Sequence, residues 1–290
     1  MPLEKLGTLR NDLVETSPFV YRDELLLLES VRPGMEDNAR DGRHYLRIRR
    51  LADGTRDVRD GEELAAGEIL TEFAQDFTFA VPLVRGDELF VYASLRGEDD
   101  AVLDEIHVFR SDDLRTWESD LAVKGSNERL FNCSVCFDGE RYVMALETDA
   151  QPWPSFTITF AVSDDLLHWE VLPPGEAILG TDRYAACPTI RFHDGRYYVW
   201  YLEHAGPWWF ETWLTRSEDL LHWQQSPQNP ILRPSTGEDI NNSDIDFCEF
   251  RSRMVIYYSW GSQRGDEHLA HARYTGTLAE WIADCYPGDR

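Results

Sequence analysis

Positively charged residues are scarce in this chain of 290 residues, which has 28 Lys and Arg against 53 Asp and Glu and a formal net charge of −25. A protein with this charge repels nucleic acid and anionic membrane surfaces, and the chain has no stripe of Lys and Arg that would bind them. We therefore expect no nucleic-acid partner and no membrane partner.

Long apolar runs are also missing. No stretch approaches the roughly 20 apolar residues that a membrane-spanning helix needs, and the N-terminus, Met1–Leu6, has no apolar run of signal-peptide length. These absences predict a cytoplasmic protein. The sequence gives no indication of its oligomeric state.

Cysteines are few, and two of them, Cys133 and Cys136, lie three residues apart in a strand pattern, where their side chains face opposite sides. We expect reduced thiols, with a zinc site or disulfides as the alternatives. The motifs Gly-x-Ser-x-Gly and His-Glu-x-x-His are absent, as is a Gly-rich phosphate loop. No run of oxygen ligands has the spacing of a calcium loop. We predict no metal site and no cofactor.

Aromatic residues, in contrast, make up 12% of the chain, which favours a folded protein with a large core. Three segments nearly superimpose on the pattern Ser-x-Asp-Leu-x-x-Trp: Ser111–Trp117, Ser163–Trp169 and Ser217–Trp223. A weaker fourth copy, Thr277–Trp281, lies near the C-terminus. The four Trp residues are spaced by 52, 54 and 58 residues, a period that fits one four-stranded propeller blade.

Each copy follows two apolar strand patterns joined by a polar turn such as Asp138-Gly139, which is a strong hairpin signal. Five such hairpins predict an all-β fold, a five-bladed β-propeller with four antiparallel strands per blade. We expect one domain, residues 1–290, with blades that begin near residues 15, 76, 130, 184 and 242. Blade 1 is irregular, because its third strand, His44–Leu51, runs into the polar stretch Asp53–Glu63. The repeated Trp is expected to pack between blades rather than to bind a ligand.

With these repeats the chain resembles, along essentially its whole length, the five-bladed propeller glycosidases of families 43 and 32. The resemblance implies an enzyme that acts on carbohydrate, with catalytic carboxylates at the starts of the innermost strands, around the axial mouth. Family 43 usually has Asp-Pro in the first and a later blade and Glu before Pro in another. Here those slots read Ser17-Pro18, Asn132-Cys133 and Ala186-Cys187-Pro188, so the usual catalytic positions are not matched.

Hairpin geometry indicates which side chains reach the mouth. Since the second strand of a hairpin runs antiparallel to the first, strand-one starts and strand-two ends share one rim. Glycoside hydrolysis needs two carboxyl groups in different environments. The candidate catalytic residues at this rim are Glu15, Glu147, Glu203 and Asp246. We expect Glu15 to be the base or nucleophile and Glu203 or Glu147 to be the general acid. Alternatively, these carboxylates are only solvated, and the segment Asn241–Asp246 is only a turn.

Other rim residues could bind the sugar. Aromatic side chains supply apolar contact to the C–H faces of a sugar ring, and amide, carboxylate or basic groups hydrogen-bond its substituents. The candidate substrate-binding residues are Asn132, Arg183, Tyr184, His204, Trp208, Asn242, Asp244, Trp260 and Arg264. The aromatic residues could instead belong to the core, and the basic residues could pair with nearby acids.

The function predicted first is an exo-acting glycosidase on a small oligosaccharide, with carbohydrate as its partner. Phosphorolysis of a glycoside, or another sugar-directed reaction, is the alternative on the same fold. A propeller that binds sugar without catalysis is the third hypothesis, since the usual Asp-Pro and Glu-Pro slots are missing.

Overall fold

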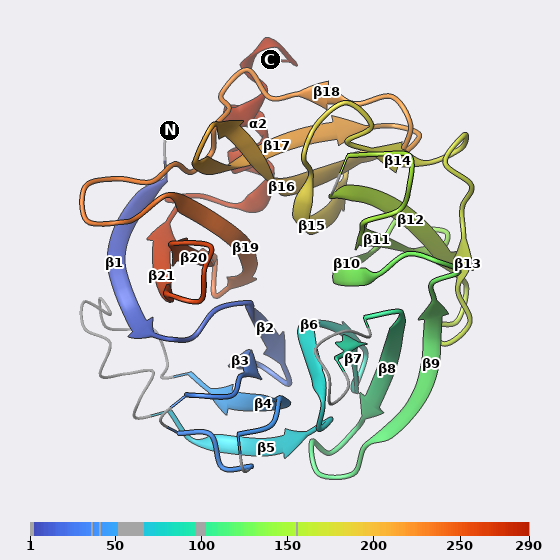
Figure 1. Cartoon of the computed structure of the whole chain (residues 1–290), viewed down its shortest axis with the longest axis vertical. Coiled ribbons are helices and arrows are strands. Elements are labelled where there is room, and N and C mark those ends of the chain that lie inside the picture. The colour runs from blue at the N-terminus through green and yellow to red at the C-terminus, as the bar shows by residue number, and fades with distance from the viewer. Residues whose placement is uncertain are drawn as a thin grey trace.

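The computed structural model describes residues 3–35, 37–40, 42–51, 67–96, 103–154 and 156–289. Its strands form five blades around a central axis, which confirms the predicted all-β propeller (Figure 1). The polar stretch Asp53–Glu63 lies outside the described residues. None of the described helices is long and apolar enough to cross a membrane.

Blades 1 to 3 follow one another along the chain, each with antiparallel strands in chain order. Blade 1 consists of β2 (Thr16–Tyr21), β3 (Glu24–Val31), β4 (Tyr45–Arg50) and β5 (Ile69–Phe73). Blade 2 consists of β6 (Phe77–Arg85), β7 (Glu88–Leu95), β8 (Glu105–Ser111) and β9 (Glu118–Lys124). Blade 3 consists of β10 (Leu130–Phe137), β11 (Tyr142–Thr148), β12 (Thr157–Ser163) and β13 (Glu170–Val171), and β14 (Ile178–Leu179) also pairs with β12.

The N-terminal strand closes the ring. Blade 4 consists of β15 (Ala186–His193), β16 (Arg196–Gly206), β17 (Trp209–Ser217) and β18 (Gln224–Gln225). Blade 5 consists of β19 (Asn241–Phe250), β20 (Arg253–Gly261), β21 (Glu267–Arg273) and β1 (Glu4–Asn11). Because β1 pairs with β21, the two ends of the chain share one sheet, as Figure 1 shows. The innermost strands begin within two residues of the expected blade starts.

The Ser-x-Asp-Leu segments are turns between the third and fourth strands of blades 2, 3 and 4. In blade 3, Ser163 Oγ accepts a hydrogen bond from the N–H of Leu166 at 2.9 Å, and Asp165 Oδ1 accepts from Leu167 and His168 at 2.8 Å each. Leu166 has a positive φ of 74°. Short polar side chains that satisfy the turn backbone explain why the motif recurs.

The repeated Trp residues pack between blades, as predicted. Each of the first three contacts an aromatic ring of the preceding blade, with centroid separations of 3.7 Å for Trp117 on Phe73, 5.5 Å for Trp169 on Tyr92 and 5.7 Å for Trp223 on Phe160. The first pair is stacked, with an interplanar angle of 3°. These contacts join each blade to the blade before it.

The fourth copy keeps the Trp but changes the local structure. Thr277 is the N-cap of α2 (Leu278–Cys285), where Thr277 and Glu280 form a capping box, and η1 (Pro287–Asp289) follows. Trp281 lies in α2, is 1% exposed, and packs on Trp200 of blade 4 at 5.2 Å. A helix therefore stands where the other blades have the turn, because β1 already supplies the fourth strand of blade 5.

The described core residues form five hydrophobic clusters, and each cluster lies between two neighbouring blades. Cys133 belongs to the cluster between blades 2 and 3, whereas Cys136 belongs to the cluster between blades 3 and 4. Their side chains thus face opposite sides of β10, as predicted, and all five cysteines are free.

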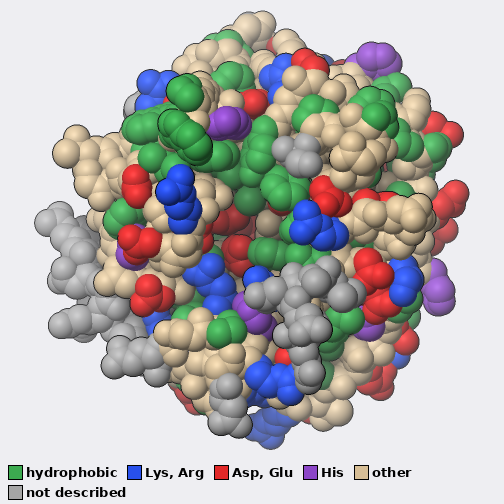
Figure 2. Space-filling model, in the orientation of Figure 1, with side chains coloured by type: hydrophobic (Ala, Val, Ile, Leu, Met, Phe, Trp, Pro, Cys, Tyr) green, Lys and Arg blue, Asp and Glu red, His purple; other side chains and the backbone are tan. Residues whose placement is uncertain are grey.

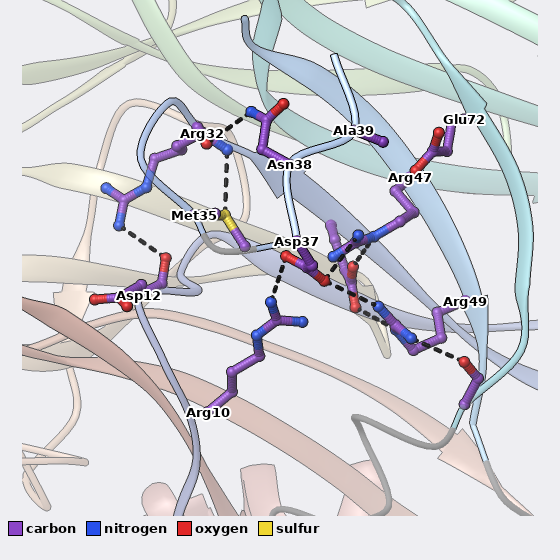
Figure 3. A network of polar contacts seen from close by, with 12 residues as sticks. Arg10, Asp12, Arg32, Met35, Asp37, Asn38, Ala39, Arg47, Arg49 and Glu72 are labelled. Atoms are coloured by element: carbon purple, nitrogen blue, oxygen red, sulfur yellow. Dashed lines mark hydrogen bonds and ion pairs between the residues drawn. The ribbon is translucent and has the colours of Figure 1, made fainter. Parts of the chain in front are cut away.

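A charged network fixes the connection between β3 and β4 (Figure 3). Asp37 accepts from Arg10 of β1 at 2.5 Å and pairs with Arg47 at 3.0 Å. Arg47 and Arg49 also hold Glu29, at 2.5 and 2.9 Å, and both Glu29 and Arg47 are fully buried. Asp37 therefore links the closing strand to blade 1.

The packing of Trp281 leads to a prediction about stability. Trp281→Ala removes a fully buried ring between blades 4 and 5, and should lower the free energy of unfolding by about 3 to 5 kcal/mol. Trp208→Ala is the matched control, because Trp208 is 67% exposed, and it should change the free energy by less than about 0.5 kcal/mol. Chemical denaturation of both variants measures the difference. Equal losses would contradict the role of Trp281 in joining the blades.

Candidate functional site

A cavity of about 370 Å³, part of it open to solvent, lies on the propeller axis. The starts of all five innermost strands line it, as hairpin geometry predicts: Glu15–Ser17, Phe79–Val81, Asn132–Ser134, Cys187–Thr189 and Asp244–Asp246. Figure 2 shows acidic side chains at the bottom of the central hollow, with hydrophobic and basic side chains around its mouth. The cavity therefore has an acidic floor and a mouth that is partly apolar.

A bulge near the start of the innermost strand recurs in blades 2 to 5. In each, one extra residue is inserted between two ladder pairs, as where Ser243 pairs with Ser259 and Asp246 pairs with Tyr257. The matching bulges lie between Thr78 and Val81, between Leu130 and Cys133, and between Ala186 and Thr189. Bulges re-aim side chains and are common next to active sites.

Left-handed backbone accompanies these bulges. Phe79, Cys187 and Asp244 lie in them with φ of 57°, 48° and 49°, and Glu15, just before β2, has φ of 54°. Non-glycine residues adopt such conformations only where the surrounding structure enforces them, and they concentrate at functional sites. All four residues line the axial cavity. The strained positions of these strands therefore meet at one place.

Glu147, at the end of β11, is 4% exposed and lies directly behind the cavity lining, where it is bound by two lining residues, Asn132 and Cys187. Its Oε2 accepts hydrogen bonds from Asn132 Nδ2 at 3.0 Å and from the backbone N–H of Cys187 at 2.7 Å. Burial raises the pKa of Glu147 to about 7, the negative charge of Asp244 adds to the rise, and the two hydrogen bonds oppose it. Glu147 can therefore carry a proton near neutral pH.

Glu15 is the second acidic group of the floor. Its Oε2 is buried without a hydrogen-bond partner. Burial raises the pKa of Glu15 well above its usual range, and the charge of Asp244 raises it further, while Arg32 and Arg96 act in the opposite direction. The raised pKa favours the protonated form of Glu15, and so a proton donor over a base.

Asp244 carries a charge that acts on both of the carboxyl groups described above and on Cys187. Ser243 Oγ donates to Asp244 Oδ2 at 2.7 Å, and the charge of Asp244 raises the pKa of Glu15, of Glu147 and of the buried Cys187 thiol. Burial is the largest cause for each of the three. The arrangement thus places two carboxyl groups with raised pKa values beside the charge of Asp244.

Two of the sequence-predicted residues in blade 5 are held by ion pairs or amide contacts. Asp246 lines the cavity, but it pairs with Arg191 at 2.5 Å and accepts the N–H of Phe247 at 2.8 Å. Asn242 is fully buried, and its Oδ1 accepts from Lys5 Nζ at 2.6 Å. Asn242 is not among the described residues that line the cavity. The structure therefore favours Asp244 over both as the group that faces a ligand.

Glu203 also lies outside the cavity lining found among the described residues. It ends a matching strand in blade 4, but it accepts from Tyr201 Oη at 3.1 Å and lies 3.7 Å from Arg183. Burial raises its pKa, and Tyr201 and Arg183 oppose the rise. Glu147 belongs to blade 3 and Glu203 to blade 4, and they lie on opposite sides of the interface between these blades. Glu203 faces this interface because Tyr201, two residues earlier on the same face of β16, belongs to the hydrophobic cluster there. They are not equivalent positions.

The predicted aromatic and basic residues lie around the mouth rather than on the floor. Tyr184 contacts Phe210 and His204, with ring centroids 5.7 and 6.2 Å apart. Trp208 is exposed at the tip of the hairpin between β16 and β17, where Arg264 lies over its ring at 5.9 Å. Trp260 donates to Thr8 and packs on His268 at 4.3 Å, so it belongs to blade 5 packing.

Among the lining residues that sequence reasoning missed are Cys187 and Phe79. Cys187 occupies a slot where family 43 usually has a carboxylate, and its Sγ accepts from Asn132 Nδ2 at 3.7 Å. The signal that could have found it is Cys187-Pro188 at the start of an innermost strand. The bulge that aims Phe79 at the axis has no comparable mark in the sequence. Within the described ranges, no three His, Cys, Asp or Glu side chains are arranged to hold a metal ion.

Comparison with known proteins identifies the fold. No protein-family model and no curated protein matches the chain. An α-L-arabinofuranosidase from Lactobacillus brevis is similar with a TM-score of 0.68, at 11% identity, over 93% of each chain. An N-acetylgalactosamine deacetylase from F. plautii, in complex with blood group B trisaccharide, is similar with a TM-score of 0.67, at 10% identity, over 99% of this chain and 98% of that one.

A family 32 β-fructofuranosidase from Bombyx mori is similar with a TM-score of 0.61, at 10% identity, over 90% of this chain and 59% of that one. The chain thus has the five-bladed propeller fold of glycoside hydrolase families 43 and 32, as its repeats predicted. Two of these structural neighbours are glycoside hydrolases, and the third is a deacetylase that was solved with a bound trisaccharide.

The raised pKa of Glu147 predicts a pH-dependent stability. The unfolded side chain loses its proton near its ordinary pKa of 4.5, but the folded one keeps it up to about pH 7, so burial of the charge costs progressively more stability between these values. Glu147→Gln avoids this cost, because its amide oxygen can accept both hydrogen bonds. Relative to the wild type, the variant should gain about 3 kcal/mol as pH rises from 4.5 to 8.

Thermal and urea unfolding at pH 5 and pH 8 measure this gain. Glu170→Gln is the control, because Glu170 is an exposed carboxylate of the same blade. It should differ from the wild type by the same small amount at both pH values. A gain for Glu147→Gln that is equal at pH 5 and pH 8 would show that Glu147 is ionised throughout.

Proposed function

We propose that the protein is a glycoside hydrolase that binds a terminal sugar in the axial cavity and releases it from a small oligosaccharide. The observation that carries the proposal is the raised pKa of Glu147, about 7, beside the charge of Asp244: Asp244 lines the axial cavity, and Glu147 is hydrogen-bonded to the lining residues Asn132 and Cys187. Glycosidases need this separation of two carboxyl groups into an acid and a base.

In the proposed reaction, Glu147 donates its proton to the glycosidic oxygen while the bond between that oxygen and the anomeric carbon breaks. Asp244 either takes a proton from the water that attacks the anomeric carbon or attacks it directly, and water then releases the sugar. The raised pKa of Glu15 disfavours a second negative charge beside Asp244. This assigns Asp244 the basic role that sequence reasoning gave to Glu15.

A hydrolysis screen tests the assignment. The purified protein is assayed with aryl α- and β-glycosides, both furanosides and pyranosides, beside Glu147→Gln, Asp244→Asn and Glu203→Gln. The first two variants should lose activity by about 10²- to 10⁴-fold, because each removes an acid or a base. Glu203→Gln should lose less than tenfold, since Glu203 contacts Tyr201 and Arg183, which are not among the described residues that line the cavity. A larger loss in Glu203→Gln than in Glu147→Gln would reverse the assignment of the acid.

The pH profile of the active protein gives an independent test. A general acid works only while it is protonated, and Glu147 is protonated below its pKa of about 7. The value of kcat/KM should therefore fall about tenfold per pH unit above pH 7. Initial rates from pH 4 to 9 on the best substrate of the screen measure this limb. A profile that stays level up to pH 9 is incompatible with Glu147 as the acid.

A second candidate is removal of an acetyl group from an amino sugar. It is favoured by the similarity to the F. plautii deacetylase over almost the whole of both chains. Incubation with N-acetylgalactosamine and N-acetylglucosamine oligosaccharides distinguishes the two reactions, because deacetylation releases acetate and glycoside hydrolysis releases a reducing sugar. Phosphate dependence of product formation would instead identify phosphorolysis. The single domain and the cytoplasmic location stay predictions.

A further inference from the structure

A row of partly buried rings leads from the axial cavity across blades 2, 3 and 4. Neighbouring ring centroids lie 6.4 Å apart for Phe79 and Phe131, 4.7 Å for Phe131 and Phe156, 5.6 Å for Phe156 and Tyr184, and 5.7 Å for Tyr184 and Phe210. We call these five residues the aromatic row. His204 continues it, stacked on Phe210 at 4.7 Å.

All members of the row lie at the rim of the cavity mouth. Phe131 and Tyr184 are at or just before strand-one starts, and Phe156 directly precedes β12, which begins at the rim where β11 ends. Phe210 lies in β17 beside the end of β16. Because successive strands of a blade are antiparallel, these positions share one rim. The row therefore reaches the same opening as the cavity.

The row lies outside the hydrophobic core clusters between blades. None of its five rings is a member of the hydrophobic clusters that the described residues form, and each remains partly exposed. An unbroken series of aromatic rings at a surface, outside any core, needs another explanation. Phe79 indicates that this explanation is ligand binding, because its ring lines the cavity and also begins the row.

We propose that the aromatic row binds the leaving-group side of an oligosaccharide, so that the sugar next to the scissile bond lies over blades 3 and 4. This deepens the proposed function, on which it rests. Ring faces stack on the C–H faces of sugars, and the exposed His204 and Arg183 at the edge of the row can hydrogen-bond hydroxyl groups. The ligand is therefore an oligosaccharide of at least two residues.

The two sides of the cavity mouth differ in chemistry, and the difference supports placing the leaving-group sugar over blades 3 and 4. Arg32 and Arg96 act on Glu15 from blades 1 and 2, whereas the aromatic row occupies blades 3 and 4 beyond its first ring. Figure 2 shows hydrophobic side chains gathered on the side of the hollow where β16 and β17 lie. A neutral sugar chain gains more contact with the aromatic side, because burial of apolar surface favours binding.

The test is a binding experiment that does not require turnover. Titration calorimetry with Glu147→Gln compares each monosaccharide with an oligosaccharide that ends in it: xylose with xylotriose, arabinose with arabinotriose, galactose with β-1,4-galactotriose, and glucose with cellotriose. Phe156→Ala and Tyr184→Ala are added separately to this background. Phe137→Ala is the matched control, because Phe137 is an exposed Phe at the opposite end of β10 in the same blade.

At least one trisaccharide should bind more tightly than its monosaccharide. Phe156→Ala and Tyr184→Ala should each weaken that trisaccharide by about tenfold and leave the monosaccharide unchanged, while Phe137→Ala changes neither. A loss that is equal for both ligands would assign these rings to the axial cavity and overturn the inference. Trisaccharides that bind no more tightly than monosaccharides, or no binding at all, would also overturn it.

The outcome is separable from that of the proposed function. Wild-type protein that binds trisaccharides through the aromatic row, but hydrolyses none of them, would support the row and contradict the hydrolase. Protein that hydrolyses a glycoside with the same KM in the wild type, in Phe156→Ala and in Tyr184→Ala would support the hydrolase and overturn the row.

Discussion

Packing between neighbouring blades is the constraint on which the rest of this structure depends. A single four-stranded sheet leaves two apolar faces, and only a closed ring of sheets covers both faces of each. The five clusters formed by the described core residues lie at the five blade interfaces, and a repeated Trp seals all but one of them. The remaining interface, between blades 5 and 1, is closed where β1 brings Leu9 and Arg10 against blade 1.

Closure of the ring also creates the site. It forces five strand starts toward one axis, and the recurrent bulges turn side chains into the space between them. Acidic groups that are far apart in the sequence then come together: Glu15 and Asp244 line one cavity, and Glu147 is buried behind its lining. Since like charges in such a place cannot all ionise, burial and mutual repulsion separate their protonation states. An acid and a base arise together from one packing arrangement.

Two kinds of carboxyl group can be distinguished in this protein, those held in ion pairs and those at the axial site. Glu29, Asp246 and Glu238 end in ion pairs with Arg47, Arg191 and Lys5, so their charges are neutralised locally. The carboxyl groups of the axial floor instead rely on amides or have no partner, as Glu15 Oε2 shows. Buried charge without a counter-ion costs stability, and proteins keep it where function requires it.

The sequence alone determined the propeller, because the Ser-x-Asp-Leu turns and the Trp spacing are local patterns that repeat once per blade. It also determined that Glu15, Asn132 and Asp244 lie at the axial rim, since hairpins fix which strand ends share an edge. Only the tertiary structure decided that Glu147 is bound by residues of the described cavity lining whereas Glu203 is not, that Asp246 is held by Arg191, and that Phe79 begins an aromatic row. Those outcomes depend on the bulges and on which face of a strand packs against which neighbouring blade. The spacing of residues along one strand predicts neither.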